Sequence, residues 1–169
     1  MCRWRGLLAG DTPDLDIAEQ RSWHNFLDAA LRMYATMNRA LVEEHHLTLN
    51  DVRLLDLSVR SPRVAARMGD IAEALMSLPS GVTRQIRRLE KQGLVARGVS
   101  PGDGRSVLAS ITPQGREALG AAMKSYGGAV RTHFLDSLTR PQILAIGENC
   151  RRISAGLKSG APSAKSGPV

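Results

Sequence analysis

The sequence of 169 residues is poor in aromatic residues and in cysteine. Aromatic residues account for 4% of the chain and hydrophobic residues of all kinds for 43%, so the core has to be mainly aliphatic. Two cysteines, Cys2 and Cys150, are too few for the disulfide framework of a small secreted protein. Long apolar runs are also missing, since nothing matches a signal peptide or the ~20 apolar residues of a membrane span. We therefore expect a cytoplasmic protein with no membrane contact.

The motifs of common enzyme classes are absent as well. The chain contains no Walker loop, no dinucleotide-binding Gly-x-Gly-x-x-Gly, no Ser-x-x-Lys and no Cys-x-x-Cys. Its four histidines are scattered at positions 24, 45, 46 and 133, and no nucleophile has a base at a recognisable spacing. These absences predict a protein that is not an enzyme and that carries no cofactor.

Charge is distributed unevenly along the chain, whose formal net charge is +7. Residues 1–59 contain six basic and nine acidic residues, whereas residues 60–105 contain nine basic and four acidic residues. Residues 131–169 contain six basic and two acidic residues, an excess that a solvated tail would explain. A basic excess centred on one segment is the electrostatic signature of a nucleic-acid-binding unit.

This basic segment contains two short helical patterns separated by a tight break. The first pattern covers Ile71–Leu75, and the break covers Met76–Pro79. In the second pattern apolar residues recur at helical spacing and a glycine follows where helices often stop; these residues are Val82, Ile86, Leu89 and Gly93. Ser77 or Ser80 is a candidate N-cap, and Pro79 suits the first turn. The pattern predicts a helix-turn-helix.

The outer face of the second helix is polar and basic. In a DNA major groove, its N-terminal side chains would reach base edges and its cationic side chains phosphates or guanine; the residues are Ser80, Thr83, Arg84, Arg87, Arg88 and Lys91. Arg87 or Arg88 could instead pair with acidic groups of the protein itself. A solvated basic face on an ordinary helix would have the same composition, so the sequence that follows has to separate these alternatives.

A β-hairpin is predicted directly after this helix. Leu94–Val99 and Arg105–Ile111 have the composition of strands, and Ser100–Gly104 between them is rich in turn residues. Arg105 would lie at or near the tip, where a basic side chain can enter a narrow minor groove. Asp103 would orient the Arg105 guanidinium, unless the two form only a surface ion pair. A hairpin at this place is typical of a wing.

Residues 70–119 resemble the MarR (multiple-antibiotic-resistance regulator) family of winged-helix repressors. The matching segments are Ile71-Ala72, Val82-Thr83-Arg84, Arg88-Leu89-Glu90, Gly93-Leu94-Val95, the Asp103-x-Arg105 pair and Ile111–Arg116. In this order and spacing the segments are specific for the family. Three positions depart from its pattern: Met76 replaces a glycine common in the turn, Gln85 stands in a commonly apolar slot, and Gly81 replaces a larger polar residue.

Long helices are predicted on both sides of the winged segment, so the predicted fold class is mainly α with a small β-wing. An arm at residues 1–14 precedes a helix at 15–46, and the winged helix-turn-helix covers 47–112, with Thr48 or Asn50 as a cap and a short strand near residues 63–68. Residues 113–158 form helices that start at a Thr112 cap and are interrupted at Gly127-Gly128, before a disordered tail at 159–169. Both helical flanks carry more apolar surface than one wing domain can cover, which predicts pairing with a second copy.

The resemblance implies a homodimer that binds a pseudo-palindromic operator in double-stranded DNA, usually as a repressor that a small ligand releases. A small aromatic or amphipathic effector would lie in the usual pocket position of the family, near Trp23, His24, Tyr34 and Arg53. Alternatives stay open: an effector-independent or architectural DNA-binding protein, a metal sensor that uses His45 and His46, or a redox sensor that uses Cys150. The place of Cys150 on an apolar stripe favours a buried, inert thiol, and we predict no bound metal.

Overall fold

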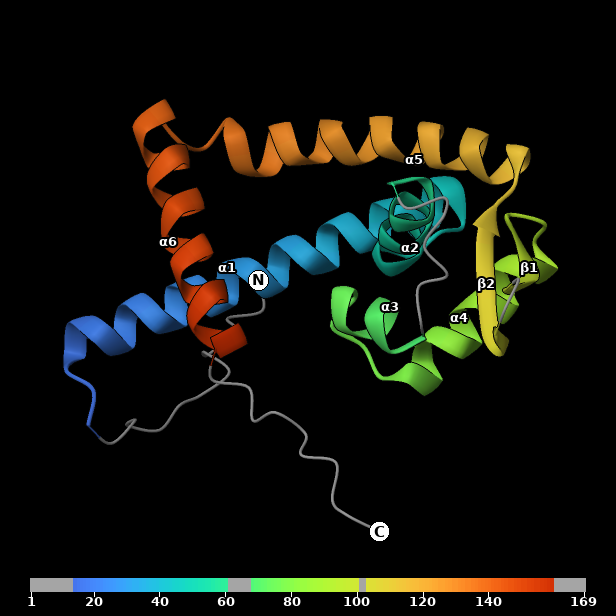
Figure 1. Cartoon of the computed structure of the whole chain (residues 1–169). Coiled ribbons are helices and arrows are strands. Elements are labelled where there is room, and N and C mark those ends of the chain that lie inside the picture. The colour runs from blue at the N-terminus through green and yellow to red at the C-terminus, as the bar shows by residue number, and fades with distance from the viewer. Residues whose placement is uncertain (1–13, 61–67, 101–102, 160–169) are drawn as a thin grey trace, which may run out of the picture. The chain divides into compact units, whose positions relative to one another are not determined.

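The computed structural model describes residues 14–60, 68–100 and 103–159, without the side chains of residues 60, 68–70, 97–109 and 159. The structure is mainly helical with a small two-stranded antiparallel sheet, which helices precede and follow in the chain (Figure 1), and this confirms the predicted fold class. The chain divides into two compact units, Met1–Gly128 and Ala129–Val169, and each is described by itself. No helix in the described ranges is both long and apolar enough to cross a bilayer.

Helix α1 (Ile17–His45) begins at a capping box. The backbone amides of Ala18 and Glu19 donate to Asp16 Oδ1 at 2.7 and 2.9 Å, and the Asp16 amide donates to the Glu19 carboxylate at 2.8 Å. At the other end His46 adopts a left-handed conformation, with φ of 55°. The predicted helix is therefore confirmed, with its start two residues later than expected.

Helix α2 (Leu49–Arg60) is capped by Thr48, one of the two predicted candidates. The Asp51 amide donates to Thr48 Oγ1 at 3.2 Å, and the Thr48 amide donates to Asp51 Oδ2 at 2.7 Å. Asn38 of α1 accepts the Leu49 amide through Oδ1 at 2.9 Å. This last bond ties the start of α2 to α1.

The predicted helix-turn-helix consists of α3 (Met68–Ala74) and α4 (Pro79–Lys91). Met76 lies in the turn with φ of 51°, a left-handed conformation that explains why glycine suits this position. The prediction that Ser77 or Ser80 caps α4 is wrong, because the N-cap is Leu78 and no side chain caps the helix. A Cβ at Gly81 would lie 3.0 Å from Ser77 Oγ, so a larger residue there would crowd the turn.

The end of α4 and the start of the hairpin form a single left-handed turn. Gly93 has φ of 73°, and the Leu94 amide donates to the Leu89 carbonyl at 2.9 Å, as in a Schellman motif. Leu89 and Leu94, the two residues that this bond joins, are both buried. The glycine predicted to stop the helix therefore has the conformation that its position requires.

Strands β1 (Val95–Ser100) and β2 (Asp103–Ile111) pair antiparallel, which confirms the predicted hairpin. The register shifts between Val99, which pairs with Val107, and Ser100, which pairs with Asp103. Residues 104–106 thus form an irregular segment of β2, and Asp103 belongs to a strand instead of the predicted turn. The short strand predicted near residues 63–68 falls mostly on residues 61–67, which lie outside the described residues.

Helix α5 (Pro113–Val130) is capped by Thr112, as predicted. The Gly115 amide donates to Thr112 Oγ1 at 3.0 Å, and this hydroxyl donates to the Gly93 carbonyl at 2.7 Å. Gly127 and Gly128 continue the helix, so the predicted interruption at these glycines is wrong. The irregular part follows them, as a π-helical turn η1 (Arg131–Leu135).

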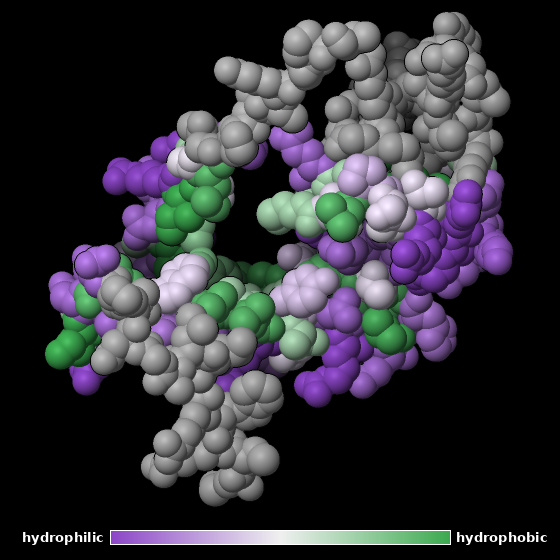
Figure 2. Space-filling model, turned by 90° about the horizontal axis from the view of Figure 1, so that it is seen from below, coloured by the Kyte–Doolittle hydropathy of each residue, from purple (hydrophilic) through white to green (hydrophobic). Residues whose placement is uncertain are grey.

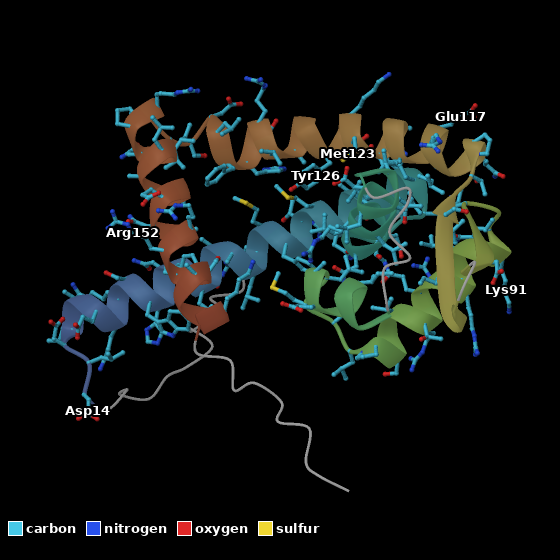
Figure 3. The ribbon with its side chains drawn as sticks, in the orientation of Figure 1. Asp14, Lys91, Glu117, Met123, Tyr126 and Arg152 are labelled. Carbon is cyan, nitrogen blue, oxygen red and sulfur yellow. The ribbon has the colours of Figure 1, made fainter. Side chains whose placement is uncertain are left out.

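The core of the first unit is aliphatic, as the composition predicts. Its largest fully buried hydrophobic side chains come from α1, α2, the segment between them, and α4: Leu41, Leu47, Leu54, Leu55, Val82, Ile86 and Leu89. Met123 and Tyr126 lie on the side of α5 that faces α1, whereas Glu117 points away (Figure 3). His45 Nε2 of α1 lies 2.8 Å from Ser125 Oγ, which links α1 to α5.

The second unit contains η1 and α6 (Arg140–Ser159). Gln142 Oε1 accepts the amide and the hydroxyl of Thr139 at 2.8 and 2.9 Å, which closes the start of α6. Along α6, large apolar side chains are exposed, including Ile146, Ile153 and Leu157. Arg151 and Arg152 both donate to the Glu148 carboxylate, which lowers the pKa of Glu148.

Candidate nucleic-acid interface

Helix α4 has one buried face and one basic face. Val82, Ile86 and Leu89 are each at most 1% exposed, so they hold the helix against the core. The opposite side carries the cationic side chains predicted from the sequence, and all of them are exposed: Arg84, Arg87, Arg88 and Lys91. Lys91 points outward in Figure 3, and the space-filling view shows hydrophilic and hydrophobic side chains in separate patches (Figure 2). This face presents positive charge to a partner.

The N-terminal turn of α4 presents small hydroxyl groups. Ser80 is exposed, and Thr83 is half-buried. The Thr83 hydroxyl donates to the Pro79 carbonyl at 3.0 Å, so its proton is engaged while its oxygen can still accept a hydrogen bond. Together with Arg84, these residues form a polar group at the N-terminal end of α4. In helix-turn-helix proteins, the corresponding end of the second helix lies in the major groove.

Arg88 is paired with a carboxylate of the protein itself. Its Nη2 donates to Oδ2 of Asp51, a residue of α2 whose side chain is 0% exposed, while the Arg88 side chain is 43% exposed. Gln85 Nε2 donates to the other oxygen, Asp51 Oδ1, at 2.9 Å. Of the two roles left open for Arg88 by the sequence, the structure places it on an internal acidic group. The polar residue in a commonly apolar slot, Gln85, has the same partner.

An open hollow lies between the start of α2 and the start of α4. Its lining residues come from both helices and from the turn before α4, and include Asn50, Ser77, Ser80, Arg84 and Arg88. Sequence reasoning did not assign Asn50 or Asp51 to this site. One signal was available for Asp51, because it stands three residues after the Thr48 cap, where a capping-box partner is expected.

Comparison with known proteins identifies the family. The model of the MarR family matches residues 47–107. The crystal structure of Sco3205, a MarR family transcriptional regulator from Streptomyces coelicolor in complex with DNA, is 30% identical to this chain. The similarity covers 89% of this chain and 96% of that chain, with a TM-score of 0.80. The chain belongs to the MarR family. It is therefore a winged-helix transcriptional regulator, of a family whose members are regulators rather than enzymes.

Two further solved structures extend the MarR comparison. AbsC, a MarR family transcriptional regulator from Streptomyces coelicolor, is 27% identical over 88% of this chain and 99% of that chain, with a TM-score of 0.76. BpsR from Bordetella bronchiseptica, whose DNA binding is regulated by 6-hydroxynicotinic acid, is 23% identical over 83% and 96%, with a TM-score of 0.71. At that identity BpsR shares the fold alone. No curated protein matches the sequence.

The wing residues predicted from the MarR resemblance are described only by their backbone. Asp103 is the first residue of β2, and Arg105 lies in the irregular segment at residues 104–106. Their side chains lie outside the described part of the structure, so the predicted pairing of Asp103 with Arg105 stays a prediction.

The residues predicted to line an effector pocket lie on two helices. Trp23 and Tyr34 of α1 are exposed, and Trp23 lies near Phe26, with ring centroids 6.1 Å apart. His24 Nε2 is buried and has no hydrogen-bond partner among the described atoms. Arg53 of α2 donates to the carbonyls of Ala74 and Leu75 at 2.9 and 3.3 Å. Arg53 thus satisfies the C-terminal end of α3, a role that the sequence did not indicate.

The candidate metal-sensing and redox-sensing residues differ in their contacts and in their exposure to solvent. His45 contacts Ser125 and lies 3.6 Å from the Glu44 carboxylate, while His46 ends α1 and is exposed. Within the described ranges, no group of three or more His, Cys, Asp or Glu side chains could hold a metal ion. Cys150 of α6 is a free thiol that a single chain leaves partly exposed, so its burial along the apolar stripe stays a prediction.

Proposed function

We propose that this MarR family member is a dimeric, sequence-specific DNA-binding repressor that a small ligand releases. The observation that carries the proposal is the two-sided α4: its aliphatic stripe is buried, and the basic face opposite is exposed next to a hydroxyl-bearing N-terminal turn. A helix of this kind, followed by a hairpin, matches the docking geometry of a recognition helix with a wing. The DNA-bound Sco3205 has the same fold.

Within this proposal the residues of α4 divide by task. Ser80, Thr83 and Arg84 contact bases, because they occupy the N-terminal end of the helix. Arg87 contacts phosphate, and Arg88 does so only with the part of its guanidinium that Asp51 leaves available. On the wing, Arg105 enters the minor groove, and Asp103 orients it.

Dimerisation is proposed from apolar faces that each unit leaves exposed. In α1 the exposed large apolar residues include Phe26 and Leu31, and in α6 they include Ile146 and Ile153. Several large apolar side chains exposed on one helix are a feature of interface-forming helices. A two-fold dimer would present two α4 helices to a pseudo-palindrome with half-site centres about 10 base pairs apart.

An effector is proposed for the region of Trp23, His24, Tyr34 and Arg53. The two exposed aromatic rings and the unpartnered nitrogen of His24 offer stacking and hydrogen bonding to a small aromatic or amphipathic molecule. BpsR, which shares the fold, is regulated by 6-hydroxynicotinic acid. Arg53 already binds main-chain carbonyls, so in this chain it would border the pocket while it caps α3.

Selection of duplexes from a random DNA pool by the full-length protein tests the proposal. We expect enrichment of an inverted repeat, protected over two half-sites in footprinting, and a dimer in sedimentation at micromolar concentration. Ile146→Asp should yield a monomer and abolish binding of the selected duplex, whereas Lys158→Asp, at an exposed and polar position of α6, should leave the dimer intact. A wild-type monomer that binds tightly, or a pool that stays unenriched, contradicts the proposal.

The release by a ligand is tested on the same duplex. A panel of aromatic carboxylic acids should include compounds that dissociate the wild-type complex, and Trp23→Ala should weaken their effect without weakening DNA binding itself. An effector-independent or architectural DNA-binding protein would keep the duplex bound throughout the panel.

A further inference from the structure

Asp51 is the charged residue that the described core buries completely, and the proposed contacts with DNA do not include it. Both carboxylate oxygens are occupied. Oδ2 accepts the Thr48 amide at 2.7 Å, the Thr48 hydroxyl at 2.6 Å and Arg88 Nη2, while Oδ1 accepts Gln85 Nε2 at 2.9 Å. Because a buried carboxylate is costly unless it is paired and hydrogen-bonded, this arrangement has to be specific.

Two of the four bonds join α2 to α4, and the other two are local to the start of α2. Thr48 stands at the start of α2, whereas Gln85 and Arg88 are three residues apart on α4 and therefore lie on one side of it. The rest of the contact between α4 and the core is aliphatic, through Val82, Ile86 and Leu89. Burial of aliphatic side chains is non-directional, so by itself it restrains the rotation of a helix about its axis only through side-chain shape. Hydrogen bonds depend on angle and add the missing restraint.

We infer that Asp51 is a positioning residue for DNA recognition. It sets the rotation of α4 about its axis through Gln85 and Arg88, and with it the direction in which Ser80, Thr83 and Arg84 point. Base readout depends on that direction, because a bidentate contact tolerates little misplacement. The inference rests on the proposed function, since it assigns sequence specificity to a residue that does not touch DNA.

Asp51 also neutralises one of the positive charges of α4. Its carboxylate offsets the charge of Arg88, whereas Arg84 and Arg87 stand exposed on the same helix. Loss of the Asp51 charge would return Arg88 to the DNA-facing surface as a full cation. Non-specific binding depends on the number of phosphates neutralised, so it would become tighter while specific binding becomes weaker.

Asp51→Asn in the full-length protein tests the inference, with a duplex selected by the wild-type protein and a random duplex of equal length as the two probes. We expect the ratio of the two affinities to fall at least about tenfold, the effect of losing one good base contact. The salt slope on the random duplex should steepen by about one unit per protomer, because one more cation is available. A loss of folding would instead weaken both duplexes together.

Two comparisons make the test specific. Asp28→Asn is the matched control, because Asp28 also accepts from an arginine, Arg32 at 2.8 Å, but on the exposed surface of α1. It should leave the affinity ratio unchanged. The second comparison is between the double variant Gln85→Leu/Arg88→Met and the triple variant that also carries Asp51→Asn. If Asp51 acts through these two residues, the addition should not lower the affinity ratio further.

A folded Asp51→Asn protein with the wild-type ratio and salt slope overturns the inference, and so does a further loss of the ratio in the double-variant background. Both results leave the proposed function standing. If the wild-type protein selects no duplex at all, the proposed function fails instead, so the two failures are distinguishable.

Discussion

Gly115 of α5 lies against the backbone of Leu94, which joins α4 to the hairpin. A Cβ at Gly115 would lie 2.1 Å from the Leu94 carbonyl oxygen and 2.9 Å from Cγ1 of Ile111. The same carbonyl accepts the Thr112 amide at 3.1 Å, so it cannot move away without loss of a bond. The glycine in the Thr112–Arg116 segment therefore allows the base of the wing to meet α5.

Gly115→Ala should destabilise the protein by ~2–3 kcal/mol, because overpacking at a backbone contact forces main-chain shifts. Urea denaturation followed by circular dichroism measures the free energy of unfolding. Gly120→Ala is the control on the same helix: a Cβ there meets nothing within 4 Å. That variant should gain up to ~1 kcal/mol from helix propensity. Equal stability of the two variants would show that the contact with Leu94 relaxes freely.

Met76→Gly should stabilise the protein by roughly 0.5–1 kcal/mol. The left-handed conformation costs an L-residue about 1–2 kcal/mol. Glycine avoids this cost, although the greater flexibility that it gives the unfolded chain offsets part of the gain. The Met76 side chain is 84% exposed, so its removal sacrifices little packing. Thermal unfolding should show a higher midpoint for Met76→Gly but not for Met76→Ala, which keeps the strained Cβ. A gain for both variants would place the strain in the side chain.

Arg84→Ala should weaken binding of the selected duplex by about 1–3 kcal/mol and relax specificity at one base position. Titration of the selected duplex and of single-base variants by fluorescence anisotropy measures both effects. Lys124→Ala removes one exposed positive charge from α5 and serves as the charge control. Equal losses of Arg84→Ala on selected and random DNA would identify Arg84 as a phosphate contact only.

Two explanations of Asp103 in the wing predict opposite effects of Asp103→Ala on DNA affinity: orientation of Arg105, or simple repulsion of phosphates. Arg105→Ala should weaken binding of the selected duplex and lower the salt slope by about one unit, because one charge per wing is lost. Asp103→Ala should also weaken binding, although it removes a negative charge, because Arg105 loses its fixed pose. Both variants are measured on one duplex at two salt concentrations. Tighter binding by Asp103→Ala would refute the orienting role.

Features that depend on neighbours in the chain could be predicted from the sequence. The aliphatic stripe of α4 has helical spacing, Gly93 has the backbone freedom that a helix end needs, and Thr112 precedes a proline at the start of α5. The hairpin follows from two strand-like segments around turn residues. The same local reasoning placed the N-cap of α4 on a serine, although the turn that Met76 begins brings Leu78 to that position.

Features that depend on how the helices pack appear only in the tertiary structure. Asp51 contacts residues 34 and 37 positions away, and Arg53 reaches carbonyls 21 and 22 positions away. Apart from the place of Asp51 three residues after the Thr48 cap, nothing in the local spacing of these polar residues distinguishes them from solvated ones. Their partners are decided when the aliphatic faces of α2, α3 and α4 come together, because burial then obliges each polar group to find a hydrogen bond. The sequence by itself determined α4 and the hairpin that follows it, whereas packing decided which arginine of α4 is held by the protein.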